Sequence, residues 1–473
     1  MSSSATVVMA EPIRARKISR GGTQSIGLFC VLALVFLRFS ALPEIIASLT
    51  GVDTFLLYVF APGAILAVMS AGGMGRLFRA RSTRLWLWFM FWMIVAVPFS
   101  SWQGGSFVFV LGYLKQNGLL LLATAGVAQT WADCKKIMYA VALAGIFNLA
   151  TAYFFQSNDG RLGLSVIGTI GNANDFAAHL LSVLPFLLFI ALRPNTTLAL
   201  RLLSAAAAAY GTLDILRTAS RGAMIALVIT GAIFLVRGSA RQRLGVGVAA
   251  MVALIGFLVF LPASARQRLF SFSKGADADA GALESSEIRE YLLKQSIVYT
   301  FEHPLFGIGP AQFAQYIGKE STIHNLASDA GGLPGSGSIQ LWRQAHNSYT
   351  QISSECGIPG LLFYLSALLS TFGLLAKIRK KATGANRKEI ATATDCLTMS
   401  LIAYSVAVFF VNFGYYYEVP AISGLVVAMW FVVSKNAKVR PRDHISPDHP
   451  AQDDIPIGFL ETTGSDFPQM ETV

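Results

Sequence analysis

The chain has 473 residues, of which 54% are hydrophobic and only 13% are charged, and its mean hydropathy is +0.55. A typical soluble domain carries roughly 25% charged residues, so this composition excludes a series of ordinary soluble domains and favours one membrane-embedded bundle. The formal net charge is +11. Because the basic residues are spread over many short loops, this charge does not indicate a nucleic-acid partner.

Apolar runs of about 17–25 residues, the length of a helix that crosses a bilayer, recur along the chain. They predict an all-α, polytopic membrane helical bundle of about 12 transmembrane helices. We place the spans at 25–41, 52–70, 85–100, 108–128, 137–155, 175–192, 199–216, 222–236, 244–262, 357–376, 392–412 and 419–434. Arg38 and Lys115 interrupt the first and the fourth span.

Basic residues alternate with these spans in a regular way. They precede the first span, recur in every second gap and follow the last span. Because short basic loops remain in the cytoplasm, we predict cytoplasmic ends at 1–24 and 436–473, with transmembrane helices 1–9 at 25–262 and helices 10–12 at 357–435. The final segment is rich in Pro, Asp and Thr, a composition typical of disorder.

Two negative observations narrow the class of protein further. The first apolar segment lacks a small-residue cleavage site, so we expect it to anchor the chain rather than to be removed. The four cysteines, Cys30, Cys134, Cys356 and Cys396, have no paired spacing. They therefore predict neither a disulfide framework nor a metal site.

One outward-facing connection, 263–356, is far longer than the usual loop between helices. Loops of this length are commonly functional, and we expect the catalytic motifs here. Ser285 and Ser286 are candidate caps for a helix from Glu287 to about Phe301, which Pro304 would end. We assign no role to the small, polar segment 271–286 or to the Gly/Ser/Pro-rich segment 331–338.

The end of this loop carries the most informative stretch, Gln344-Ala-His346-Asn-Ser-Tyr-Thr-Gln351. An imidazole at a membrane surface, among polar neighbours, is a candidate for proton transfer. Glu355 follows nine residues later, and on a continuous helix it would point away from His346. A capping or surface role is therefore as good an expectation for Glu355 as one in catalysis.

Arginines form a second group of candidates. On a continuous helix Asp214, Arg217 and Arg221 would share one face. Arg217 would then pair with Asp214, and Arg221 would lack a partner. A guanidinium at the membrane boundary suits a phosphate, which it grips with two parallel hydrogen bonds. Arg289, on the predicted loop helix, is by itself typical of a solvated charge.

Two further outward turns hold unusual residues. Arg161 precedes Gly171-Asn-Ala-Asn-Asp175, whose Asn and Asp are more typical of a helix cap than of a binding site. Tyr416 lies in Tyr415-Tyr-Tyr-Glu418. An aromatic belt at the membrane boundary explains that pattern, although tyrosines also stack on sugar rings.

In this order, the motifs resemble the O-antigen ligase and O-antigen polymerase family of bacterial envelope glycosyltransferases. The matching motifs are Gly171-Asn-Ala-Asn174, Ser220-Arg-Gly222, Arg289 with His303-Pro-Leu-Phe-Gly-Ile-Gly309, and His346-Asn347 with Glu355-x-Gly357-x-x-Gly360. Each motif is short, and their order within about residues 25–435 makes the likeness specific.

The resemblance implies a metal-independent, inverting glycosyltransferase that needs no cofactor. It would move a glycan from undecaprenyl diphosphate to an acceptor hydroxyl at the periplasmic face of the bacterial inner membrane, in lipopolysaccharide or exopolysaccharide biosynthesis. By the same resemblance, Arg221 and Arg289 would hold the diphosphate and His346 would activate the acceptor. The further residues that would bind substrate are Arg217, Arg161, Asn347, Glu355 and Tyr416.

Elementary chemistry agrees with this picture. The departing diphosphate gains negative charge, which either a divalent metal or cationic side chains can stabilise. The sequence shows no clear outward-facing cluster of Asp and Glu, and arginines are a plausible substitute.

Several alternatives stay open at this point. The acceptor can be a lipid A core sugar, a growing glycan, or a protein Ser or Thr in an O-oligosaccharyltransferase. A transporter or flippase of lipid-linked glycans is a second class, but such proteins show inverted repeats and polar residues at mid-depth, and we find no convincing repeat. A non-catalytic scaffold would not need Arg221, Arg289 and His346 together.

Overall fold

The computed structural model describes residues 22–156, 161–194, 196–237, 243, 247, 280–328, 343–384 and 386–438. In these ranges the chain is helical without any strand, and one isolated bridge joins Gln156 to Leu164. The predicted span 244–262 and the segment 331–338 lie outside the described residues, as do most of 271–286 and of the two terminal tails.

Helices follow one another along the chain with short connections. In order, they are α1 (Gly22–Ser40), α2 (Leu42–Thr50), α3 (Leu56–Ser70), α4 (Gly73–Arg79), α5 (Arg81–Ala96), η1 (Val97–Phe99), α6 (Gln103–Tyr113), η2 (Leu114–Gly118), α7 (Leu119–Val127), α8 (Trp131–Phe154), α9 (Ala173–Leu192), α10 (Leu198–Arg217), α11 (Arg221–Arg237), α14 (Ala280–Glu302), α15 (Phe313–Ser328), α16 (Ser348–Lys381), α17 (Arg387–Ala407) and α18 (Glu418–Lys438).

The number of membrane crossings is smaller in the described residues than the predicted twelve. Eleven of the predicted spans coincide with a helix, but eight helices are long and apolar enough to cross a membrane, or up to 10 if each bent pair counts as one. The bent pairs are α1 with α2 (62°) and α3 with α4 (78°). Ala41 and Gly72 break these helices with φ of 52° and 60°, which hydropathy alone does not reveal.

The two charges that interrupt predicted spans are accommodated differently. The guanidinium of Arg38 lies 4.5 Å from the centre of the Tyr417 ring, a cation–π geometry. Lys115 lies in the π-helical turn η2, through which the helix continues from Gln103 to Val127. Neither charge therefore ends its helix.

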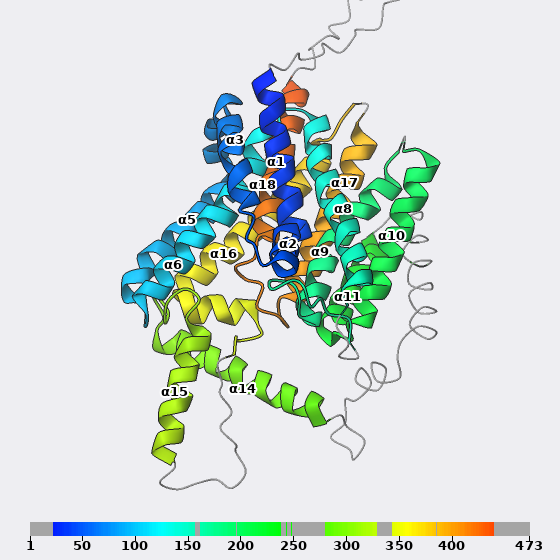
Figure 1. The fold of residues 1–473 in the computed structure, drawn as a ribbon. Coiled ribbons are helices and arrows are strands. Elements are labelled where there is room, and N and C mark those ends of the chain that lie inside the picture. The colour runs from blue at the N-terminus through cyan, green and yellow to red at the C-terminus, as the bar shows by residue number, and fades with distance from the viewer. Residues whose placement is uncertain are drawn as a thin grey trace, which may run out of the picture.

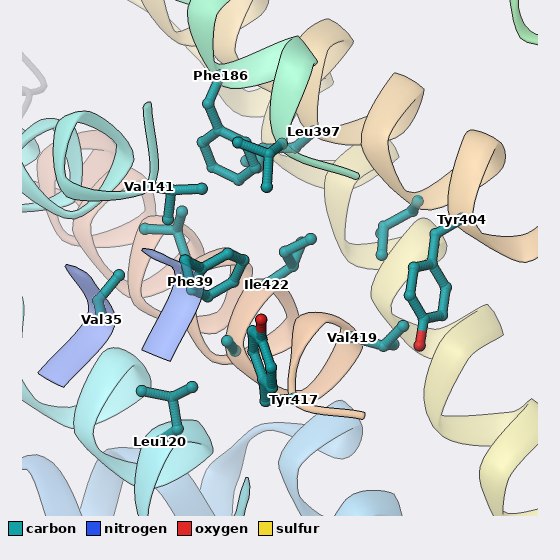
Figure 2. Packing of buried hydrophobic residues seen from close by; sticks show 14 of the residues in the cluster. Val35, Phe39, Leu120, Val141, Phe186, Leu397, Tyr404, Tyr417, Val419 and Ile422 are labelled. Carbon is teal, nitrogen blue, oxygen red and sulfur yellow. The ribbon is translucent and has the colours of Figure 1, made fainter. Parts of the chain in front are cut away.

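The core of the bundle gathers around α9. This helix is apolar all round, with a mean hydropathy of 2.0 in its membrane window, and such helices are buried on every side. It packs against α8, α10 and α17. Figure 2 shows the same cluster, in which the rings of Phe39 and Tyr417 meet edge to face at 5.1 Å.

The segment that contains α14 and α15 has a small core of its own, which we call the loop core. It consists of Leu292, Tyr299, Ile308, Phe313, Ile317 and Ala345, with Ile288 and Tyr316 packed against it. Figure 1 shows α14 and α15 at the end of the bundle opposite to the start of α1 and the end of α18.

The predicted start of the loop helix was wrong. α14 begins at Ala280 rather than Glu287, so Ser285 and Ser286 lie inside the helix and do not cap it. The Ala, Leu and Glu residues of this turn are strong helix formers, and they outweigh the capping preference of serine. Its end at Glu302, two residues before Pro304, agrees with the prediction.

Helix caps explain where the helices next to the loop begin. The side chain of Asn172 accepts a hydrogen bond from the Asn174 backbone and starts α9, which confirms the predicted cap. Asn347 accepts hydrogen bonds from the N–H groups of Tyr349 (3.0 Å) and Thr350 (3.1 Å) and starts α16. Two asparagines of the sequence motifs are thus helix caps at the outer end of the bundle.

Candidate active site

His346 immediately precedes the cap of α16, and its backbone is held in an unusual conformation. Its φ is 53°, in the left-handed region that costs energy for any residue with a Cβ. On one side Ala345 is buried in the loop core. On the other, Ser348 donates from its backbone to Val408 (2.9 Å) and from its hydroxyl to Val411 (2.7 Å). These anchors hold the backbone on both sides of His346.

A cavity of about 300 Å³ opens beside the imidazole of His346. We call it the arginine pocket, and its lining residues are Arg161, Asn172, Asn174, Ile288, Arg289, Arg343 and His346. The structure thus brings together three residues that the sequence predicted, Arg161, Arg289 and His346. With three guanidinium groups and no carboxylate among its described lining residues, the pocket favours an anion.

The same surroundings set the protonation state of His346. Burial, together with the guanidinium groups of Arg289 and Arg343, lowers the pKa of His346 from 6.5 to about 4. The imidazole is therefore neutral at neutral pH. A neutral imidazole is able to accept a proton.

The loop before α9 forms one wall of the pocket. Arg161 donates from Nε to the Thr218 carbonyl (2.8 Å) and from Nη2 to Asn174 Oδ1 (2.9 Å). Thr169 of the same loop donates its hydroxyl (2.8 Å) and its backbone N–H (3.0 Å) to the carboxylate of Glu44 on α2. The loop is therefore tied to α2, α9 and the turn after α10.

The turn between α10 and α11 separates two arginines that the sequence had placed on one helix face. α10 ends at Arg217 and α11 begins at Arg221, because Ala219 adopts a φ of 50°. Arg217 pairs with Asp214 (3.0 Å), as predicted, and also donates to Gln156 (2.9 Å). The expectation that Arg221 lacks a partner was wrong, because this residue does make an interaction.

Neither Arg217 nor Arg221 lines the arginine pocket. The turn that carries them is nevertheless its neighbour, since Arg161 bonds to the carbonyl of Thr218. Close packing also explains why the last residue of the Ser220-Arg-Gly motif, Gly222, is a glycine. A Cβ there would lie 2.5 Å from Phe410.

The motifs His303–Gly309 and Glu355–Gly360 contact each other through backbone hydrogen bonds, and we call this contact the joint. α16 is interrupted at Gly357 (φ 70°, ψ 178°). The N–H of Ile358 therefore donates to the Pro304 carbonyl (2.8 Å) instead of to Ser354, and Glu355 has no helical donor because residue 359 is proline. The loop replaces the missing donors: Ile308 donates to the Ser354 carbonyl (2.8 Å) and Gly309 to that of Glu355 (3.0 Å). A Cβ at Gly357 would lie 2.0 Å from the Leu305 carbonyl oxygen, so only glycine fits.

Glu355 belongs to this joint rather than to the pocket. It is completely buried, and its carboxylate accepts hydrogen bonds from the backbone N–H groups of Ala311 (3.0 Å) and Phe313 (3.0 Å). Phe313 is the first residue of α15, where a negative charge is stabilising. Of the two roles expected for Glu355, capping was therefore right and a surface position was wrong. His346 and Glu355 do not share one helix, because α16 begins at Ser348.

The tyrosines before α18 do not form an exposed belt. Tyr415 and Tyr417 are buried, and Tyr416 stacks on Phe413 with ring centres 3.9 Å apart. The Tyr416 hydroxyl donates to the Thr169 carbonyl (2.8 Å). Tyr416 therefore supports the loop before α9 through Thr169.

Sequence reasoning missed two features near the site. Arg343 lines the pocket, and the only signal was a basic residue three positions before His346. Behind the site, His179 lies 2.9 Å from Glu418 through Nδ1 and 2.8 Å from the Asn148 amide nitrogen through Nε2. The Asn148 amide nitrogen also donates a hydrogen bond to the Phe39 carbonyl. Because an amide nitrogen is a donor, Nε2 of His179 is the acceptor of its other bond, and the imidazole proton lies on Nδ1, toward Glu418.

Comparison with known families adds an independent finding. Residues 205–365, from α10 to α16, match the family model described as O-antigen ligase. No curated protein matches the chain. The matched segment contains Arg221, Arg289, Arg343 and His346, together with the joint at Gly357. This match supports the resemblance of the segment to the O-antigen ligase family, in a helical chain with several apolar helices long enough to cross a membrane.

Proposed function

We propose that the chain transfers a glycan from undecaprenyl diphosphate to a sugar hydroxyl at the periplasmic face of the bacterial inner membrane. The observation that carries this proposal is the arginine pocket, where Arg161, Arg289 and Arg343 surround the neutral imidazole of His346. A lipid diphosphate complements this charge, and each guanidinium is able to grip phosphate oxygens with two hydrogen bonds.

The proposed reaction is a single displacement. The acceptor oxygen forms a bond to the anomeric carbon while His346 takes the proton of the hydroxyl. The bond from that carbon to the phosphate oxygen breaks, and the diphosphate leaves with the electron pair, still attached to its lipid. Because the oxygen enters on the face opposite to the leaving group, the configuration inverts.

Arginines would stabilise the charge of the leaving group. Arg289 and Arg343 lie close enough to His346 to act on it electrostatically, so a diphosphate between them would also lie next to the reacting carbon. Arg221, at the start of α11, would extend the cationic surface toward the membrane. In this proposal guanidinium groups do the work that a divalent metal does in other glycosyl transfers, and no metal or cofactor takes part.

The proposed orientation follows from the basic loops and from the arrangement of the helices. The start of α1 and the end of α18 lie at one end of the bundle, and α14 and α15 lie at the other (Figure 1). The excess of Lys and Arg at the first end favours the cytoplasm. Cytoplasmic termini and a periplasmic pocket are compatible with an even number of crossings, which is up to ten in the described residues, or twelve if α11 and 244–262 also cross.

The proposal is tested by glycan synthesis in membranes that carry wild type, His346→Gln, Arg289→Gln or Arg221→Gln at matched expression. We expect loss of product with accumulation of the lipid-linked precursor in all three variants. Lys294→Gln is the matched control, because Lys294 is exposed on the same helix as Arg289 and pairs only with its neighbour Glu290 (2.8 Å). Normal product from His346→Gln and Arg289→Gln would refute the assignment.

A further inference from the structure

A second cavity, of about 350 Å³, lies on the other side of the outer loop. Its lining residues are Ser101, Gln315, Tyr316, Lys319 and Glu320. Four of them belong to α15, and Ser101 precedes α6. We call this cavity the α15 pocket. The family resemblance and the reaction proposed above give it no role.

The side chains of the α15 pocket offer the groups that recognise a sugar. They are a hydroxyl, an amide, an ammonium, a carboxylate and an aromatic ring, and rings with a polar edge suit a ligand that has both apolar and hydroxylated faces. The mixed charge of Lys319 and Glu320 distinguishes this cavity from the arginine pocket, which carries cations alone.

Neighbouring residues hold part of the lining in place, while Ser101, Lys319 and Glu320 are exposed. The Tyr316 ring meets Tyr299 edge to face at 4.9 Å and His303 at 6.1 Å. The Tyr299 hydroxyl donates a hydrogen bond to Glu320. Burial, with Glu320 beside them, raises the pKa of Tyr299 and that of Tyr316. Both phenols therefore keep their protons and remain neutral hydrogen-bonding groups.

The two pockets share one scaffold. Ile288 lines the arginine pocket and Tyr316 lines the α15 pocket, and both pack against the loop core. Along α14, Ile288 and Tyr299 are separated by roughly 16 Å, at 1.5 Å per residue. A monosaccharide does not span that distance, whereas a short oligosaccharide does. Ala345 of the loop core is also adjacent to His346.

We propose that the α15 pocket is a binding subsite for the acceptor saccharide, which holds an inner part of that chain while its terminal hydroxyl reaches His346. This inference rests on the proposed glycan transfer, because only that reaction requires an acceptor chain. It assigns Gln315, Tyr316 and Lys319 to acceptor binding, separate from the arginines that would hold the donor.

Thiol protection tests binding at this subsite without relying on catalysis. Gln315→Cys would be labelled with a maleimide in purified full-length protein in lipid nanodiscs, with the wild type as background for its four native thiols. The probe is the surface glycan of the wild-type strain, released by mild acid. We expect it to slow labelling at least threefold at Gln315→Cys and to leave Lys294→Cys on α14 unchanged.

Glycan synthesis supplies the second readout. Lys319→Ala and Gln315→Ala change exposed or half-buried side chains outside the loop core, and we expect each to raise the acceptor concentration for half-maximal rate by up to about tenfold. Donor use at saturating acceptor should stay near the wild-type value. If neither thiol protection nor synthesis changes, the subsite is refuted.

The outcomes separate the two proposals. Loss of synthesis in His346→Gln without protection of Gln315→Cys would overturn the subsite and leave the proposed function intact. Protection of Gln315→Cys together with normal synthesis in His346→Gln would overturn the proposed function alone. Protection by vesicles of anionic phospholipid, and not by the glycan, would overturn the subsite in favour of a lipid headgroup site.

Discussion

Replacing Arg343 by glutamine should shift the pH dependence of the reaction. In the wild type, burial and two neighbouring guanidinium groups hold the pKa of His346 at about 4. The substitution removes one positive charge and retains a polar side chain of similar length. Since that charge disfavours the imidazolium, its removal raises the pKa of His346.

The size of the shift is bounded by its causes. Burial is the largest of them and Arg289 comes before Arg343, so we expect a rise of about one unit, the lower end of what a nearby charge produces. At pH 4.5, about three quarters of His346 is then neutral in the wild type and about one quarter in Arg343→Gln. Relative to pH 7, the rate attributable to the base at pH 4.5 then falls about 1.3-fold in the wild type and about fourfold in Arg343→Gln, a difference of roughly threefold.

The assay is the initial rate of donor consumption in reconstituted protein between pH 4 and 8, at low donor concentration. Arg343→Gln should also bind the diphosphate more weakly, which lowers the rate equally at every pH, so the shape of the profile isolates the effect on the base. Arg343→Lys retains the charge and is the control. A wild-type acidic limb near pH 6.5, or identical limbs in wild type and Arg343→Gln, would refute the reasoning.

Three further predictions concern stability. Gly357→Ala should abolish the folded protein in size-exclusion chromatography, because its Cβ would lie 2.0 Å from the Leu305 oxygen at a φ of 70°. Gly373→Ala, with no atom within 4 Å of a Cβ, should be tolerated. Equal yields of the two variants would contradict the close packing described at the joint. Glu355→Ala leaves two N–H groups without their acceptor and should cost about 2–6 kcal/mol in unfolding free energy, with partial recovery in Glu355→Gln; an unchanged melting temperature would show that these hydrogen bonds contribute nothing. The folded pKa of His346 is about 4, below its ordinary 6.5, so the unfolded chain binds the proton first as pH falls through that window and stability declines. His346→Gln should lose less stability than the wild type between pH 6.5 and 4, and parallel melting curves would contradict this.

Much of the helical fold was predictable because membrane spans are recognisable in a sequence by their length and hydropathy. Eleven predicted spans coincide with helices. The predicted spans end at residues 41 and 70, close to the bends at Ala41 and Gly72, but hydropathy did not reveal the short helices α2 and α4 that follow at an angle. The early start of α14 was missed because capping preference and helix propensity compete there, and their balance depends on the packing of the loop.

The candidate site was predicted in part. His346, Arg289 and Arg161 meet at one pocket, whereas Asn347 and Glu355 serve as caps and Tyr416 as a support. Residues at helix ends carry the same amide and carboxyl groups that substrates require, so sequence alone does not separate the two uses. Arg343 was missed because a lone basic residue in a polar loop carries no pattern.

The joint at Gly357 also determines which part of the site is able to move. His346, Arg343 and Arg289 lie on a wall whose backbone is bonded directly into the membrane-spanning helix α16 through Ser354 and Glu355. Separating this wall from α16 would leave the carbonyl groups of the buried residues Ser354 and Glu355 without these donors, at a cost of several kcal/mol. The loop that carries Arg161 is held by hydrogen bonds of Thr169 to Glu44 and from Tyr416, and by a backbone hydrogen bond from Leu162 to Arg217 (3.0 Å). For the proposed transfer, this means that His346, Arg343 and Arg289 would keep their register with α16 while a bulky lipid-linked glycan enters or leaves the pocket.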